Sequence, residues 1–221
     1  TLKELPQDPS VSFEAEVNAE DQLSSARNHS ATHLLHESLR SILGTHVEQK
    51  GSLVRPENLR FDFSHFEKID SKTLTSIEQD VNSKIIANIS LDERRAIPLE
   101  QAQAEGAMML FGEKYSDSVR MIGFGTSKEL CGGIHVPATG SIGLFRILSE
   151  YSIASGIRRI EAVTGEAAYL ASLKDRNDLE AIGSNFKGAK DLVKAVDDLQ
   201  KNHTNLSKEV DELRRKETGN V

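Results

Sequence analysis

Hydrophobic residues recur at two spacings along this chain, and each spacing predicts one kind of element. Apolar residues three and four positions apart, such as Leu35 and Leu39, form one buried face of a helix. Alternating apolar and polar residues, as in Leu59-Arg-Phe-Asp-Phe-Ser, are typical of a half-buried strand. The pattern predicts helices over residues 22–43, 71–89 and 99–107. It predicts strands over residues 11–17, 59–64, 118–124, 142–149 and 158–163.

These elements predict the fold class and the domain organisation. Helices and strands follow one another without a regular β-α alternation, which favours an α+β domain with a mixed, largely antiparallel sheet. Gly51-Ser52 predicts a turn. We expect a linker or strand segment over residues 1–21, one domain over residues 22–165 and a helical segment over residues 166–221.

The helical segment has the pattern of a hairpin or a coiled coil. One helix is predicted over residues 167–182 and a longer one over residues 189–215. A single helix with an apolar seam is marginal in water, so the long helix needs a partner. The partner is either the 167–182 helix or the same helix of a second chain, which would give a homo-oligomer through residues 189–215. Positions alternately four and three apart form the seam: Leu192, Val196, Leu199, His203, Leu206, Val210 and Leu213.

Charge and hydropathy argue against two classes of protein: strong polyanion binders and membrane proteins. The net charge of −7 argues against a strong, sequence-blind binder of polyanions. Residues 1–21 carry six acids and one base, whereas residues 22–165 carry 17 acids and 16 bases, so the central domain is nearly neutral. No apolar run is long enough to span a bilayer. We therefore expect a cytoplasmic protein that binds no membrane.

Four side chains with metal-binding chemistry occur as two distant pairs. His29 and His33 are four residues apart in a predicted helix, so they share a face. Cys131 and His135 have the same interval in a glycine-containing segment. A thiolate with imidazoles suits Zn²⁺. Because Cys131 is the single cysteine, it is a free thiol, a metal ligand or a nucleophile. His36 lies about 10 Å along the helix from His29, so we expect it to pack near the site without binding the same ion.

The residues alone leave the role of this metal open. Either pair by itself is a weak signal, because two histidines on a helix are more often surface or core residues. A zinc peptidase is disfavoured, since Ser30 follows His29 where such enzymes carry a catalytic glutamate. Four protein ligands are typical of a structural site, whereas a catalytic site keeps one position open.

Five sequence blocks resemble the alanyl-tRNA synthetases, in the same order and over about residues 11–217. The blocks are His29-Ser-Ala-Thr-His-Leu-Leu-His36, Gly44-Thr-His-Val-Glu-Gln-Lys-Gly-Ser52, Arg60-Phe-Asp-Phe63, Cys131-Gly-Gly-Ile-His135 and Gly156-Ile-Arg-Arg-Ile-Glu-Ala-Val-Thr-Gly165. The resemblance implies the editing-domain fold shared by threonyl- and alanyl-tRNA synthetases, followed by helices. The family usually has threonine where Ser30 and Ile134 stand, and only the first exchange keeps a hydroxyl group.

The resemblance also implies an activity and its residues. Zinc would be bound by His29, His33, Cys131 and His135, and the domain would hydrolyse the ester of Ser-tRNA(Ala) and Gly-tRNA(Ala). The partner implied is the aminoacylated 3′ end of tRNA(Ala). Gln49 falls on the family's substrate-discriminating glutamine, and the catalytic candidates are Gln49, Cys131 and Thr32.

The parent enzyme of this family ligates alanine to tRNA(Ala). Its ATP and Mg²⁺ would belong to an aminoacylation domain whose Gly-x-Gly-x-x-Arg motif does not occur in this sequence. The alternative to an editing hydrolase is a tRNA-binding module with a structural zinc and no catalysis of its own.

Overall fold

The computed structural model describes residues 8, 12, 16–109 and 115–218. The predicted strand over residues 11–17 lies mostly outside the described residues. Its three described members, Ser12, Glu16 and Val17, belong to no helix or strand. The chain divides into two compact units, residues 1–169 and residues 170–221.

A four-stranded antiparallel sheet forms the main layer of the first unit, in the order β1-β2-β7-β6. Leu59, Phe61 and Phe63 of β2 are fully buried on one face, as their alternation predicts. Gly51 and Ser52 lie inside β1, so the predicted turn is wrong; the β1–β2 register shifts just before them, at a bulge. The strands are Gln49–Val54 (β1), Leu59–Ser64 (β2), Phe145–Ala154 (β6) and Ile157–Thr164 (β7).

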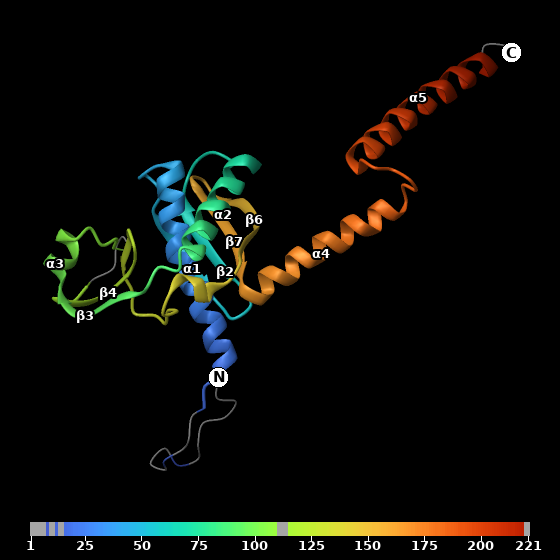
Figure 1. The fold of residues 1–221 in the computed structure, drawn as a ribbon. Helices are drawn as coiled ribbons and strands as arrows, with labels where there is room; N and C mark the ends of the chain where they lie inside the picture. Colours follow the sequence, from blue (N-terminus) through green and yellow to red (C-terminus); the bar gives the residue numbers. More distant parts are fainter. Residues whose placement is uncertain (1–7, 9–11, 13–15, 110–114, 219–221) are drawn as a thin grey trace. The chain divides into compact units, whose positions relative to one another are not determined.

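Two helices, α1 (Ala19–Leu43) and α2 (Ser71–Ile86), cover this sheet side by side (Figure 1). Helix α1 packs against β1, β2 and β7, and α2 packs against β6. The helix prediction is confirmed for both, to within three residues at either end. Helix α1 ends at Gly44, whose φ of 117° lies in the region that favours glycine. The main core therefore lies between these helices and the sheet.

A smaller antiparallel sheet, in the order β3-β4-β5, completes the first unit. Strand β4 (Ser118–Phe124) was predicted, whereas β3 (Asp92–Pro98) and β5 (Ser127–Leu130) were not. Helix α3 (Leu99–Ala104) packs against β3 and β4, and the short 3-10 helix η1 (Thr139–Ile142) contacts α1 and α2. The α+β class and the antiparallel pairing are confirmed, with the strands divided between two sheets.

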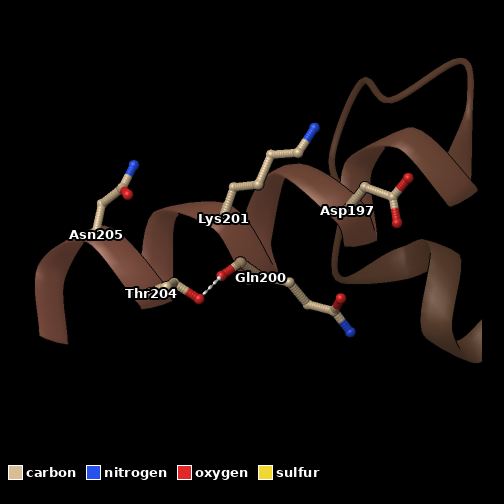
Figure 2. Close-up of a pocket in the computed structure, with 5 residues that line it drawn as sticks. All are labelled: Asp197, Gln200, Lys201, Thr204 and Asn205. Carbon is tan, nitrogen blue, oxygen red and sulfur yellow. Dashed lines mark hydrogen bonds between the residues drawn. The ribbon is translucent and has the colours of Figure 1, made fainter. Parts of the chain in front are cut away.

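The second unit contains most of α4 (Gly165–Ser184) and all of α5 (Leu192–Thr218). In the described chain, the seam residues Leu199, Leu206 and Val210 are exposed, so a hairpin or coiled-coil partner stays a prediction. Among the described helices, none combines the length and apolar character of a membrane span. Figure 2 shows the polar side chains of α5 that line a shallow hollow: Asp197, Gln200, Lys201, Thr204 and Asn205.

A buried asparagine joins three parts of the first unit just before the first candidate metal ligand. Asn28 of α1 is 1% exposed, and its amide nitrogen donates to the carbonyls of Arg55 (2.8 Å) and Pro56 (3.1 Å) in the β1–β2 connection. Its side-chain oxygen accepts from the Thr164 hydroxyl at the end of β7 (2.7 Å). This side chain therefore fixes α1 against the β1–β2 connection and the neighbouring end of β7, at one end of the sheet.

Replacing Asn28 with alanine tests how much its three side-chain hydrogen bonds stabilise the fold. The Asn28→Ala variant leaves two carbonyls and one buried hydroxyl without their partner, so we expect a loss of about 2 kcal/mol in the free energy of unfolding. Urea unfolding of the metal-free protein measures it. Asn58→Ala, in the same connection, is the control and should change the free energy by less than about 0.5 kcal/mol. Equal losses of unfolding free energy in the two variants would show that the hydrogen bonds of Asn28 do not stabilise the packing of α1 on the sheet.

Candidate metal centre

The two distant pairs of candidate ligands meet at one place in the fold. His29 and His33 lie on one face of α1, Cys131 directly follows β5, and His135 comes four residues later. Their ligand atoms all lie within 4.8 Å of one another. The chain therefore contains a cluster of three imidazoles and one thiol that could hold a metal ion.

The spacing of the donor atoms fits zinc. The Cys131 Sγ atom lies 3.3 Å from His29 Nε2 and 3.4 Å from His135 Nε2. Zinc binds sulfur at about 2.3 Å and nitrogen at about 2.0 Å, so two such ligands at a tetrahedral angle are about 3.5 Å apart. These two distances already match that geometry.

The protonation states of two ligands also suit metal binding. Burial opposes ionisation of the Cys131 thiol, but hydrogen bonds with His135, His29 and His33 outweigh it and lower its pKa to about 3. Burial lowers the pKa of His135 to about 4. At neutral pH these groups are a thiolate and a neutral imidazole, the forms that bind metal ions.

A buried carboxylate orients His33 through the ring nitrogen that does not face the metal site. Glu129 of β5 places Oε2 2.9 Å from His33 Nδ1 and Oε1 2.9 Å from His36 Nδ1. Burial raises the pKa of Glu129, but its contacts with His33 and His36 outweigh this effect and lower it to about 2. Because Glu129 occupies Nδ1 of His33, Nε2 is the atom left for a metal. His36 contacts the same carboxylate and lies outside the four-residue cluster.

Glu129 was not predicted from the sequence, although a signal for it was present. Glu129 and Cys131 are two residues apart, and alternate residues of a strand point to the same face. Recognition of β5 as a strand would have placed the carboxylate beside the thiol. The segment is only four residues long and follows a glycine turn, so its pattern is too short to identify it.

Ser30 and Arg120 fix the segment that carries Cys131 and His135. The buried Ser30 Oγ atom accepts the Val136 N–H (3.1 Å) and lies 3.2 Å from His135 Nδ1. The Arg120 guanidinium donates to the carbonyls of Cys131 (3.0 Å) and Gly133 (2.6 Å). The hydroxyl at position 30 thus orients a ligand, while the side chain of Ile134 is 43% exposed.

Comparison of the sequence with known proteins identifies the family of this chain. Residues 119–161 match the model of the threonyl and alanyl tRNA synthetase second additional domain. The alanine–tRNA ligase of Flavobacterium psychrophilum is 52% identical over 211 residues, which cover 96% of this chain and 24% of that enzyme. The enzyme of Christiangramia forsetii is 51% identical over 219 residues (99% and 25%), and that of Porphyromonas gingivalis 46% over 213 residues (96% and 24%).

Over nearly its whole length, the chain belongs to the alanyl-tRNA synthetases. It spans about a quarter of the length of the relatives it matches. The family resemblance found in the sequence is therefore confirmed.

The other two catalytic candidates drawn from this family lie on different elements. Gln49 begins β1 and is half-buried, next to the bulge in that strand. Thr32 is buried on α1, where its hydroxyl donates to the Asn28 carbonyl (2.9 Å). Among the described residues, no hydrogen bond joins either side chain to the four candidate ligands. Their catalytic roles stay predictions.

The two glycines beside Cys131 differ in the space around them. A Cβ atom at Gly133 would lie 2.1 Å from His29 Cε1, a separation that forces the imidazole to move. A Cβ atom at Gly132 would meet nothing within 4 Å. Glycine at position 133 is therefore required for His29 to approach Cys131.

This difference provides a matched pair of variants. Gly133→Ala should displace His29 and weaken zinc binding by at least about tenfold, whereas Gly132→Ala should leave it nearly unchanged. Competition with a chromophoric chelator measures the affinity, and circular dichroism of the metal-free proteins checks that both fold. Equal zinc affinities in two folded variants would contradict the assignment of His29 as a ligand.

Proposed function

We propose that this chain is a zinc-dependent aminoacyl-tRNA deacylase that hydrolyses the ester of Ser-tRNA(Ala) and Gly-tRNA(Ala). The cluster of His29, His33, Cys131 and His135 carries the proposal, because its donor set and spacing fit zinc. The family supports it, since the relatives are alanine–tRNA ligases and residues 119–161 match a domain of threonyl and alanyl synthetases. The partner proposed is the aminoacylated 3′ end of tRNA(Ala).

The residues around the cluster would hold its ligands in position before the substrate binds. Ser30 and Glu129 hold the imidazoles of His135 and His33 in fixed orientations. When bound, zinc would supply a Lewis acid close to the ester. An aminoacyl ester is already activated, so a modest catalyst suffices for its hydrolysis.

Gln49 is the proposed source of selectivity. Its amide group offers both a donor and an acceptor for the hydroxyl of serine. The methyl group of alanine cannot use such polar groups, and sites built for a hydroxyl discriminate strongly against analogues that lack it. This reasoning covers serine; glycine has no hydroxyl group and is included on the family resemblance alone.

One observation favours a second function. Four protein side chains can complete a tetrahedral zinc site, and closed sites of this kind are usually structural. The chain would then be a zinc-stabilised tRNA-binding module without catalysis. Ligation of alanine to tRNA(Ala) with ATP is proposed only for a whole enzyme of the family, of which this chain matches about a quarter.

A deacylation assay separates the two functions. We expect the zinc-loaded chain to release serine from Ser-tRNA(Ala) faster than alanine from Ala-tRNA(Ala). Gln49→Ala should lower the rate with Ser-tRNA(Ala) by about tenfold or more, because a positioned polar partner of the substrate is lost. Gln79→Ala, an exposed glutamine on α2, is the control and should retain the wild-type rate.

The assay is repeated at high protein concentration, so that weak capture of tRNA does not hide activity. Serine release at the uncatalysed rate by a zinc-loaded chain would rule out the deacylase. In that case the structural role of the metal would stand.

A further inference from the structure

A hollow of about 600 Å³ adjoins the metal centre, within the usual size range of small-molecule sites. The residues that line it include Gly132, Gly133 and His135 from the segment after β5. Glu93 and Arg95 of β3 also line it. Because His135 belongs both to this lining and to the metal cluster, a molecule in the hollow lies beside the metal centre.

The charged groups of the hollow leave one positive charge uncompensated. The hollow contains two guanidinium groups, Arg95 and Arg120, and one carboxylate, Glu93. Glu93 accepts from Arg120 (2.7 Å) and from Arg95 (2.6 Å), and these hydrogen bonds lower its pKa to about 2. One carboxylate therefore faces two guanidinium groups, and the surplus favours an anion.

The two arginines differ in how firmly they are held. Arg120 also donates to the carbonyls of Cys131 and Gly133, so it is committed to the segment that carries the ligands. Arg95 is 77% exposed, and its one described partner is Glu93. Exposed ion pairs contribute little to stability, so Arg95 can exchange Glu93 for another anion. Glu93 would keep Arg120 as its counter-ion after this exchange.

The backbone of β3 directs Arg95 into the hollow. The β3–β4 register is interrupted between Arg94 and Ile97, and Ala96 has a φ of 54°, which residues other than glycine rarely adopt. Arg95 pairs with Glu93 at the hollow, whereas Arg94 forms its ion pairs with Asp92 and Glu105, outside the hollow.

We propose that Arg95 binds a backbone phosphate of the RNA next to its terminal nucleotide while the aminoacyl ester lies at the metal centre. This inference rests on the proposed deacylase function, because it takes the ester of an aminoacylated RNA as the substrate. The ester is attached to the terminal nucleotide, so a phosphodiester group accompanies it wherever it binds. A guanidinium group matches a phosphate with two parallel hydrogen bonds, and Arg95 is the arginine of the hollow that is not bound to backbone.

The test compares steady-state kinetics and salt dependence in the zinc-loaded chain. Arg95→Gln should raise the KM for Ser-tRNA(Ala) by about fivefold to tenfold with little change in kcat. The plot of log kcat/KM against log salt should become less steep by about 0.7 to 1, the value for one phosphate contact. Zinc content should not change, and Arg95→Lys should restore part of the lost affinity.

Arg94→Gln is the matched control, because it removes the same charge from the neighbouring residue, whose ion pairs lie outside the hollow. It should leave both KM and the salt slope at wild-type values. A wild-type KM and salt slope in Arg95→Gln would overturn the inference and leave the deacylase function intact. A parallel loss of kcat and zinc in Arg95→Gln would also overturn it, since Arg95 would then act only by supporting Glu93 and Arg120. Failure of the wild-type chain to hydrolyse the ester would instead remove the proposed function, and the inference with it.

Discussion

The arrangement of this domain depends on holding α1 against the segment that follows β5. The four candidate ligands come from positions a hundred residues apart, and buried polar contacts keep the two segments together. Glu129 meets His33, Ser30 meets His135 and the Val136 N–H, and Asn28 fixes α1 to the sheet one residue before His29. Because these groups are buried, losing one partner leaves the other without a hydrogen bond. The contact between α1 and the segment after β5 is therefore sensitive to single substitutions.

Sequence alone predicted the parts of this fold that rest on local periodicity. The i, i+4 spacing of His29 and His33 follows from helix geometry, and the alternation in β2 follows from strand geometry. Short or irregular strands escaped prediction for the same reason. Strand β5 has four residues, and Gly51 and Ser52 lie inside β1 next to a bulge.

The contacts that complete the site join residues far apart in the sequence, so the spacing of apolar residues does not predict them. Glu129 reaches His33 and His36 across 96 and 93 residues, and Arg120 reaches the carbonyls beside the cluster from β4. The ligand types could be identified from their chemistry, whereas the groups that orient them required the structure. The same is true of the charge surplus beside the cluster, which depends on Arg95 and Arg120 meeting the single carboxylate of Glu93.

Metal analysis of the chain, purified without a metal-affinity step, tests directly whether the four-residue cluster holds zinc. We expect close to one zinc per chain in the wild-type protein, either retained or rebound after removal. Cys131→Ala should lose most of this zinc, because the thiolate is one of four ligands. A wild-type chain that folds but neither retains nor rebinds zinc would contradict this assignment.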